Sequence, residues 1–356
     1  MKKKRKIRVM VVAGGSGGHI FPAMGFCEEL DELRLSGNVE IYFVSSCRQE
    51  VLKSIPVIYN PVYFKEDRRL FALCKFLIRS VFVLLKIQPD IIFGFGGYLS
   101  VPFICMGKLI GAKVFIHEQN VVPGKANIFL AMFADRIAVS FARTKDFFSG
   151  HGKKVILTRY PLRKSLCRVS KRQAFDFFGF QEGLFTVLVM GGSQGARRVN
   201  DFFLEALKEN KNLERYQILH LCGVNDAGRL KNEYLRIPVK SKVFAFLPEM
   251  NYAYSVADIV LSRAGASSIA EIIHFGLPSV LIPYPFAGAH QVENARVLSG
   301  KGASFFLEEN QVTPALISGL LDLFASDCVK RETMAFHAAS AFEDKDVVRL
   351  SQIIFL

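Results

Sequence analysis

Short apolar runs alternate with longer segments of mixed polarity along nearly the whole chain. The runs are rich in Val, Ile, Leu and Phe, and the segments between them have the length and apolar spacing of helices. Apolar runs that are separated by helices are typical of parallel strands buried on both faces of a sheet. We therefore predict strands at residues 7–13, 39–45, 90–93, 113–117, 136–140, 153–157, 185–190, 216–221, 243–246, 259–262 and 279–283.

The alternation is interrupted once, at the charged stretch 163–183, and then restarts. Two such series in 356 residues predict two domains. The expected fold class is α/β, with two doubly wound, Rossmann-like domains whose parallel sheets face a cleft and bind ligands beyond the carboxyl ends of their strands. We place the first domain at 1–162 and the second at 163–340. A C-terminal helix at 341–356 follows, and it can pack back on the first domain.

Both halves carry a glycine-rich turn directly after their first strand, AGGSGGH at 13–19 and MGGSQGA at 190–196. Glycines let the backbone approach a ligand without interference from Cβ atoms, and the following helix offers free N–H groups to a phosphate. The pair predicts two phosphate-type loops that face one cleft. Taken alone, the second loop is also consistent with a plain turn from strand to helix.

The first turn argues against a dinucleotide cofactor. A dinucleotide-binding GxGxxG motif needs a glycine where this chain has Ile20. It also needs a carboxylate at the end of the second strand, where this chain has Val44, Ser45 and Ser46. We therefore predict that the protein does not bind NAD.

Two further polar motifs follow predicted strands. The segment SRAGASSIAE at 262–271 opens a helix and places Glu271 one turn inside it, where a carboxylate can accept from a ribose diol or merely complement the helix dipole. The runs GGYLSVP at 96–102 and HEQN at 117–120 bring polar side chains to the carboxyl ends of strands. A ligand binds at such a place in an open α/β sheet, or a buried structural network forms there.

Charge and cysteine content narrow the class of partner. Lys and Arg outnumber Asp and Glu by 46 to 32, and the net charge of +14 favours anionic partners, unless it serves solubility alone. The chain has no recognisable nucleic-acid motif, so we expect no nucleic-acid partner. The seven cysteines stand singly without a CxxC pair, which predicts a reducing compartment and argues against a disulfide framework or a zinc site.

Two apolar stretches imitate membrane segments. The run at 9–13 is too short for the core of a signal peptide, and Arg8 interrupts it. The uncharged stretch 91–107 contains four glycines and a proline, so it fits strand, turn and helix better than a spanning helix. We therefore expect a cytosolic protein whose contact with a membrane is peripheral.

A candidate for that contact extends from Arg68 to Ile87, with the sequence RRLFALCKFLIRSVFVLLKI. This predicted helix is apolar on nearly all sides and carries Lys75, Arg79 and Lys86. Such a helix can lie in an anionic lipid interface with its basic groups at the headgroups. The alternative is a core helix of the first sheet, which accounts for at least its buried face.

These motifs, in this order, resemble the MurG family, the UDP-N-acetylglucosamine:lipid-linked N-acetylmuramoyl-pentapeptide N-acetylglucosaminyltransferases of bacterial cell-wall synthesis. The resemblance runs from about residue 7 to about residue 303. It implies the GT-B fold and a metal-free, cofactor-free, inverting transfer of N-acetylglucosamine from UDP-GlcNAc to the C4 hydroxyl of lipid I, which yields lipid II. It also implies an N-terminal domain for acceptor and membrane, a C-terminal domain for the nucleotide sugar, and a peripheral location at the cytoplasmic face of the cell membrane.

The resemblance also assigns binding roles by position. In the first domain and the linker, the residues implied are Ser16, Gly17 and Gly18 at the donor, Asn120 at the sugar and Arg163 at the diphosphate. In the second domain they are Ser193 at the phosphate, Leu247 at uracil, Ala266, Ser267, Ser268, Ile269, Ala270 and Glu271 around phosphate and ribose, and Gln291 at a sugar hydroxyl. The chain departs from the family pattern at Arg159 and Tyr160 in the linker, at Ala289 in place of an acidic residue and at Ser268 in place of threonine.

Two residues are candidates for the catalytic base. His19 closes the first glycine loop at a helix start, where the positive end of the dipole disfavours imidazolium; a structural role in that loop is the alternative. Glu118 ends a strand, where loss of solvent raises the pKa of a carboxyl group. Two other hypotheses are a different GT-B enzyme, such as a UDP-GlcNAc 2-epimerase or a glycolipid synthase, and a non-catalytic module that binds a membrane surface or nucleic acid.

Overall fold

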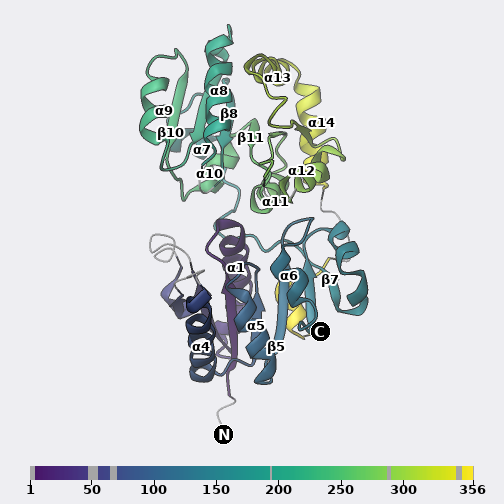
Figure 1. Cartoon of the computed structure of the whole chain (residues 1–356). Coiled ribbons are helices and arrows are strands. Elements are labelled where there is room, and N and C mark those ends of the chain that lie inside the picture. The colour runs from purple at the N-terminus through teal and green to yellow at the C-terminus, as the bar shows by residue number, and fades with distance from the viewer. Residues whose placement is uncertain are drawn as a thin grey trace. The chain divides into compact units, whose positions relative to one another are not determined.

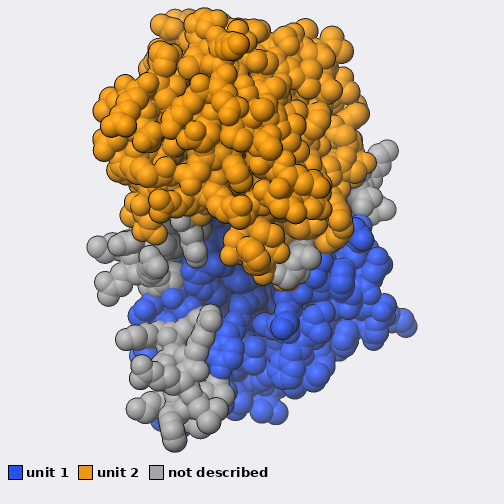
Figure 2. Space-filling view, turned by 45° about the horizontal axis from the view of Figure 1, so that its top comes forward, with its two compact units in different colours: residues 1–164, 344–356 blue, residues 165–343 orange. Residues whose placement is uncertain are grey.

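The computed structural model describes residues 5–46, 55–64, 70–192, 195–286, 290–341 and 347–355. Two compact units divide the chain: unit 1 consists of Met1–Lys164 and Asp344–Leu356, and unit 2 of Ser165–Glu343 (Figure 2). The chain therefore enters unit 2 after Lys164 and returns to unit 1 for its last residues. Each unit is built on its own parallel sheet, which confirms the predicted fold class.

Unit 1 has a seven-stranded sheet in the order β3-β2-β1-β4-β5-β6-β7, and all neighbours are parallel. The strands are β1 (Ile7–Ala13), β2 (Val39–Ser45), β3 (Pro61–Tyr63), β4 (Ile91–Gly94), β5 (Lys113–Glu118), β6 (Arg136–Val139) and β7 (Val155–Leu157). The helices are α1 (Gly17–Glu29), α2 (Asp31–Leu35), α4 (Leu70–Ile87), α5 (Ser100–Leu109) and α6 (Lys125–Leu130), with 3-10 segments η1 (Val57–Tyr59), η2 (Ala142–Lys154) and η4 (Leu350–Phe355). Strand order reverses between β1 and β4, which is the switch point where such sheets bind ligands.

Alternate side chains of β1 face two different cores, as expected for a strand that is buried on both faces. Val9 and Val11 pack in a core with residues of α1 and η4, whereas Met10 and Val12 pack in a core with residues of α4 and α5. The helices α4, α5 and α6 therefore cover the face of the sheet opposite to α1 (Figure 1).

Unit 2 repeats this plan with a six-stranded sheet in the order β10-β9-β8-β11-β12-β13, again parallel throughout. The strands are β8 (Phe185–Met190), β9 (Tyr216–Leu221), β10 (Lys240–Phe244), β11 (Ile259–Ser262), β12 (Ser279–Leu281) and β13 (Ser304–Phe306). The helices are α7 (Lys171–Phe178), α8 (Arg197–Glu209), α9 (Ala227–Tyr234), α10 (Met250–Val256), α11 (Ala266–Phe275), α12 (His290–Ser299), α13 (Pro314–Ser326) and α14 (Cys328–Ala339), with the 3-10 turn η3 (Leu213–Arg215). Its switch point lies between β8 and β11.

Several elements differ from the sequence-based expectations. The sequence predicts one helix at about 19–35 after the first glycine loop, but α1 ends at Glu29 and α2 begins at Asp31 after a break at Leu30. The charged stretch 163–183, which interrupts the predicted alternation, contains α7. This helix begins with a capping box, in which the side chain of Ser170 accepts from the backbone N–H of Gln173 and the side chain of Gln173 accepts from that of Ser170. The end of the chain forms a 3-10 segment, η4, rather than an α-helix over the described residues.

Candidate functional site

Two glycine-rich turns meet at the switch point of unit 1. Gly14 follows β1, while Gly96 and Gly97 follow β4 with φ of +85° and +79°. A Cβ atom on Gly97 would lie 3.1 Å from the Cα of Gly14, so the two turns are in direct backbone contact. The close approach and the positive φ angles both require glycine at these positions. After this contact Ser16 starts α1, and the N–H groups of Gly17 and Gly18 lie in its unpaired first turn.

The ring of His19 lies over these glycines. A Cβ atom on Gly14 would be 3.1 Å from its Nδ1, and one on Gly96 would be 3.2 Å from its Nε2. Nδ1 also lies 2.9 Å from the hydroxyl oxygen of Ser16. Although the residue as a whole is half-buried, this packing removes solvent from the ring and lowers the pKa of His19 to about 4. The imidazole is therefore neutral at pH 7, and the cause is loss of solvent rather than the helix dipole suggested by the sequence; the role of His19 as base stays a prediction.

The carboxylate of Glu118 is surrounded by hydrogen-bond donors. Its Oε1 accepts from the backbone N–H of Asn120 at 2.9 Å and from the Asn120 side-chain amide at 3.2 Å. Its Oε2 accepts from the backbone N–H of Gly124 at 3.0 Å and from the side-chain amide of Asn127 at 2.8 Å. Burial raises the pKa of Glu118, and the four donors act in the opposite direction because they stabilise the ionised form.

This geometry favours the buried structural network among the alternatives for HEQN. His117, Glu118 and Gln119 are all buried, and the Glu118 carboxylate folds the segment from Asn120 to Asn127 around itself. Asn127 also reaches the glycine turn, since a Cβ atom on Gly96 would lie 3.5 Å from its amide nitrogen. Glu118 thus orders the loop beside His19. The amide of Asn120 points back to Glu118, and its predicted contact with the sugar stays a prediction.

Arg163 belongs to unit 1, although the sequence placed it at the start of the second domain. Its guanidinium carbon lies 4.5 Å from the centre of the Phe21 ring, on α1. A cation over an aromatic face is held in place by the ring quadrupole. Arg163 is therefore attached to the helix that begins with the first glycine loop.

The glycine loop of unit 2 requires glycine for its backbone conformation, as the turn at Gly96 and Gly97 does in unit 1. Gly192 and Gly195 have φ of +83° and +77°, and a Cβ atom on Gly191 would lie 2.3 Å from the backbone nitrogen of Ala196. The predicted phosphate ligand Ser193 lies outside the described residues. Gly195 packs on the carbonyl group of Cys222, at the end of β9, where a Cβ atom would approach the oxygen to 2.5 Å.

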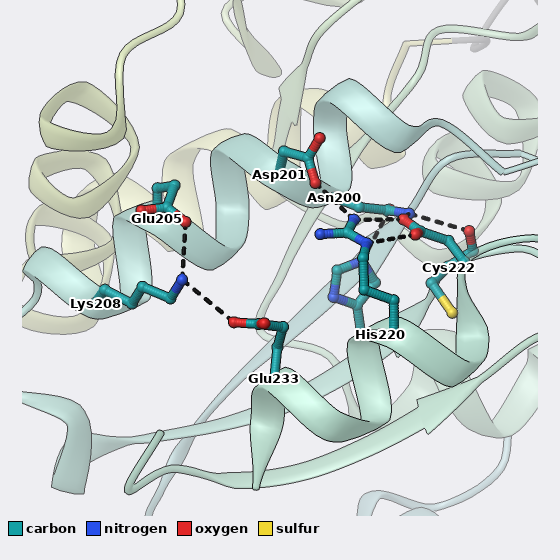
Figure 3. A network of polar contacts seen from close by, with 9 residues as sticks. Asn200, Asp201, Glu205, Lys208, His220, Cys222 and Glu233 are labelled. Carbon is teal, nitrogen blue, oxygen red and sulfur yellow. Dashed lines mark hydrogen bonds and ion pairs between the residues drawn. The ribbon is translucent and has the colours of Figure 1, made fainter. Parts of the chain in front are cut away.

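A buried polar network supports that carbonyl group (Figure 3). Asn200, in the second turn of α8, donates to the oxygen of Cys222 at 3.1 Å and to the carboxylate of Asp226 at 2.7 Å. His220 bonds through one ring nitrogen to Asn200 and through the other to the Tyr234 hydroxyl, at 3.0 and 2.9 Å. Such a satisfied network fixes the relative positions of α8, α9 and β9, and hence the base of the glycine loop.

The second loop at this switch point starts α11 at Gly265. Ala266 is buried and lies in the first turn of α11, where backbone N–H groups have no partner within the helix, and Ser267 and Ser268 are partly exposed. Ile269 and Ala270 are also buried, and the backbone N–H of Ile269 donates to the oxygen of Gly265 at 2.9 Å, so their predicted contacts stay predictions. Glu271 lies beyond the first helical turn, and the dipole alternative is therefore weak, because that effect falls off within the first turn. The hydroxyl of Tyr254 donates to its Oε2 at 2.8 Å.

Leu247 and Gln291 lie at the same edge, Leu247 in the loop after β10 and Gln291 in the first turn of α12. Leu247 is buried between β10 and α10, which leaves its backbone as the group suited to a base contact. The side-chain oxygen of Gln291 accepts from the backbone N–H of Tyr284 at 2.9 Å. The predicted contacts of both residues with uracil and sugar stay predictions.

The structure adds partners that sequence reasoning missed. Asn127 and Tyr254 hold the two candidate carboxylates Glu118 and Glu271, and Arg263 joins the ends of β11 and β12 by donating to the carbonyl oxygens of Ile282 and Pro283, both at 3.1 Å. For Asn127, the sequence signal that could have indicated a partner is a polar residue on the buried side of a helix. Only the tertiary structure identifies its partner.

The predicted interfacial helix is α4, whose described part starts at Leu70 and thus leaves Arg68 out. Its inward residues Leu84 and Ile87 are buried in the core of unit 1. Its exposed residues include Leu77, Ile78, Phe82 and Leu85, together with the basic Arg79 and Lys86. Phe82 is 68% exposed, so this helix is both a core helix and an apolar surface.

The described segments lack two other kinds of feature. Across these segments, no helix is both long and apolar enough to cross a membrane. Nor does the described part of the chain bring three or more His, Cys, Asp or Glu side chains together in a group that could hold a metal ion.

Two family models match the chain. Residues 9–139 match the glycosyltransferase family 28 N-terminal domain, and residues 186–349 match the glycosyltransferase family 28 C-terminal domain. Similar proteins include the UDP-N-acetylglucosamine--N-acetylmuramyl-(pentapeptide) pyrophosphoryl-undecaprenol N-acetylglucosamine transferases of Thermodesulfovibrio yellowstonii and Coxiella burnetii. The former is 35% identical over 88% of each chain, and the latter 34% identical over 96% of each.

Solved structures agree with these matches. The crystal structure of Acinetobacter baumannii MurG superposes with a TM-score of 0.72 at 25% identity and covers 99% of this chain and 98% of that one. A UDP-N-acetylglucosamine 2-epimerase from Listeria monocytogenes reaches a TM-score of 0.71 at 12% identity, over 97% and 99% of the chains. The second likeness shows a shared fold alone.

Proposed function

The chain belongs to the MurG family of glycosyltransferases, and from that premise we propose how its residues carry out the reaction. The protein is an enzyme of peptidoglycan synthesis that transfers N-acetylglucosamine from UDP-GlcNAc to lipid I. Unit 2 binds the nucleotide sugar, and unit 1 holds the acceptor and the base.

The edge of unit 2 between β8 and β11 is suited to UDP. The backbone N–H groups at the start of α8 and α11 bind the diphosphate, together with the hydroxyls of Ser267 and Ser268. Glu271 accepts from the ribose diol, with Tyr254 holding its carboxylate. Leu247 binds uracil through its backbone, and Gln291 holds a sugar hydroxyl. The support for these roles is their common position at the carboxyl ends of the strands.

His19 is the general base of an inverting displacement. The C4 hydroxyl oxygen of the acceptor attacks the anomeric carbon, the bond from that carbon to the diphosphate oxygen breaks, and the hydroxyl proton passes to His19. UDP leaves with the bonding electron pair, and helix N–H groups and Arg163 stabilise its charge. The observation that carries this role is the packing of the ring against Gly14 and Gly96, which keeps the imidazole neutral at a loop of N–H groups.

A turnover assay tests the activity. With UDP-GlcNAc and a lipid I analogue, we expect UDP release that depends on the acceptor and a disaccharide product with a β-1,4 bond. Epimerisation of UDP-GlcNAc without any acceptor would indicate a different enzyme of the same fold. Absence of turnover, with retained binding to vesicles, would indicate a membrane-binding module.

Membrane attachment through α4 is part of this proposal. The acceptor is linked to a lipid, so the enzyme must work at a membrane surface, on its cytoplasmic face. The exposed side chains Ile78, Phe82 and Leu85 enter the lipid interface, while Arg79 and Lys86 lie at anionic headgroups. No contact with nucleic acid is part of the proposal.

A further inference from the structure

One buried carboxylate in unit 2 contacts both of the segments that are proposed to bind the diphosphate. Glu309 lies in the loop between β13 and α13, and only 5% of the residue is exposed. Its Oε1 lies 3.0 Å from Nη1 of Arg198, the second residue of α8. Its Oε2 forms an ion pair with Arg263, which directly follows β11. A single side chain therefore joins the start of α8 to the loop before α11.

Arg263 extends this connection to the loop between β12 and α12. Its Nη1 donates to the carbonyl oxygens of Ile282 and Pro283, and its guanidinium carbon lies 5.5 Å from the centre of the Tyr284 ring. The backbone N–H of Tyr284 in turn donates to the side-chain oxygen of Gln291. The segments that follow β8, β11, β12 and β13 are thus linked by polar contacts, and these four strands are consecutive neighbours in the sheet.

Stability alone does not explain this cluster. Removing a carboxylate and a guanidinium from water costs about as much as their attraction returns, so a buried ion pair adds little net stability. The pair with Arg198 adds little as well, because 62% of the Arg198 side chain is exposed and ion pairs of exposed groups are weak. What the cluster does determine is geometry, since each planar guanidinium presents its N–H donors in a fixed fork.

Attraction of the donor does not explain Glu309 either. UDP is an anion, and the two arginines would attract it more strongly without a carboxylate beside them. Glu309 therefore acts against donor binding through its charge. Its contacts with both diphosphate segments are better explained by the position that it gives to them.

We propose that Glu309 is a positioning residue for donor binding, which holds the start of α8 and the loop before α11 in fixed relative positions through Arg198 and Arg263. This inference rests on the proposed function, because it matters only if these two helix starts bind the diphosphate. A hydrogen bond from an N–H group weakens steeply when its angle departs from the favoured range. Helix starts that move independently would therefore lose part of their contacts with the diphosphate.

Matched variants and two ligands test the proposal. Glu309→Met removes both ion pairs, Glu309→Gln keeps an oxygen that can accept from one arginine, and Glu308→Met is the control because Glu308 is exposed. Calorimetry should show the Kd of UDP raised about tenfold in Glu309→Met, about threefold in Glu309→Gln and unchanged in Glu308→Met.

Uridine separates positioning from a general loss of structure. It lacks the diphosphate, and its ribose contact Glu271 is held independently by Tyr254. The Kd of uridine, measured by ligand-observed NMR, should therefore stay within about twofold of the wild type in Glu309→Met. A merely structural role would weaken the binding of uridine and UDP by the same factor.

Arg198→Met is a second variant that does not leave a buried charge unpaired. Because the Arg198 side chain is mostly exposed, the variant should melt like the wild type, while the freed start of α8 raises the Kd of UDP about threefold or more. In the Glu309→Met background, Arg198→Met should have no further effect, since the contact between the two residues is already lost. If Arg198 bound the diphosphate directly, its effect would persist in that background.

Three results would overturn the proposal: tighter binding of UDP in Glu309→Met, which would show that Glu309 acts through its charge, equal losses for UDP and uridine, and additive effects in the double variant. If Glu309→Met does not fold, an unchanged Kd for UDP in Arg198→Met overturns it alone. A wild-type protein that does not bind UDP would reject the donor site proposed for unit 2, and this inference with it. Wild-type UDP affinity in a folded Glu309→Met variant rejects the inference only.

Discussion

The outer helices of the two units carry opposite kinds of side chain. In unit 1, α4 exposes Leu77, Ile78, Phe82 and Leu85. In unit 2, the exposed residues of α8 are all charged: Arg197, Arg198, Glu205, Lys208 and Glu209. The Nζ atom of Lys208 lies 2.9 Å from Oε1 of Glu205 and 3.3 Å from Oε2 of Glu233, and both contacts are solvent-exposed ion pairs (Figure 3). The same architecture thus carries one surface suited to lipid and one suited to water.

The switch points of the two units also differ. The switch point of unit 1 places a neutral imidazole against glycines, so it offers a group that can take a proton. The switch point of unit 2 offers helix starts and a carboxylate held by Tyr254, groups that bind rather than react. Under the proposed function, chemistry and lipid contact belong to unit 1 and donor binding belongs to unit 2. Variants in one unit should therefore leave the function of the other intact.

The largest effect is expected from His19→Ala. Loss of a general base typically costs about a hundredfold to ten-thousandfold in rate, so kcat should fall by that factor. The Kd for UDP should hardly change, because the donor contacts of unit 2 are untouched. In the wild type, kcat/KM should stay level between pH 7 and pH 5 and fall near pH 4, where His19 becomes protonated, and the variant should lack this acidic limb.

Glu118→Gln is the control for this assignment. An amide would place an NH2 group against the donors of Gly124 or Asn127, so the loop should lose order and the protein should melt earlier. Near-normal turnover of His19→Ala, together with a Glu118→Gln variant that is inactive but melts normally, would identify Glu118 as the base.

The second effect concerns the outer surface of unit 1. Replacing both Phe82 and Leu85 with Ser should weaken binding to anionic vesicles by about a hundredfold or more, because each large apolar side chain contributes roughly 1.5–3 kcal/mol when fully buried. Co-sedimentation measures the binding, and a thermal melt should stay unchanged because both residues are exposed. Lys208→Ser on α8 is the matched control and should bind vesicles normally. Retained binding with an unchanged melt rejects α4 as the membrane surface.

The edges of the sheets show where prediction from the sequence failed. The central strands β1, β2, β8, β9 and β11 match their predicted bounds, because a strand with neighbours on both sides and helices on both faces is a continuous apolar run. The edge strand β10 begins at Lys240 and ends before the predicted run does, and the short edge strands β3 and β13 were missed. Edge strands face solvent and carry mixed side chains, so their pattern is weak.

The candidate sites likewise contain features that the sequence predicted and features that it did not. Glycine loops and strand ends are local features, and the sequence predicted their positions. The Asn127 amide at Glu118 and the Tyr254 hydroxyl at Glu271 come from residues nine and 17 positions away in the chain, and only packing brings them together. The break of the first helix at Leu30 is also tertiary in origin, since Leu30 is fully buried and Asp31 turns to the hydroxyl of Tyr59.

Glu271→Ala should have the third effect, on unit 2. Loss of a charge-assisted hydrogen bond costs roughly 1.5–3 kcal/mol, so the Kd for UDP should rise about tenfold to a hundredfold. Affinity for the acceptor should stay the same. Tyr254→Phe is the matched control: it keeps the ring that packs on Phe275 and removes the hydroxyl that donates to Glu271 and to the Sδ atom of Met190, so it should raise the Kd by a smaller factor. Calorimetry that finds no change in the Kd of Glu271→Ala contradicts the ribose contact.

The smallest expected effect is on the pH dependence of the free energy of unfolding, which can be altered in one unit at a time. Each has one fully buried histidine on its sheet, His117 in unit 1 and His220 in unit 2, and burial lowers the pKa of both to about 3. In the unfolded chain these side chains titrate near pH 6.5. Below pH 6.5 the unfolded state therefore binds a proton that the native state does not, and each histidine lowers the free energy of unfolding as the pH falls towards 3.

Gln substitution removes this proton while keeping a side chain that can hydrogen-bond. We expect His220→Gln to reduce the acid-side slope of the stability of unit 2 by about 1.4 kcal/mol per pH unit between pH 6 and pH 4, and to leave the slope of unit 1 unchanged. His117→Gln should do the reverse. Denaturant titrations at several pH values, with one probe in each unit, measure both slopes. A change in both units after either single substitution would show that they unfold together, and the division of the molecule into two independent units would then fail for stability even where it holds for ligand binding.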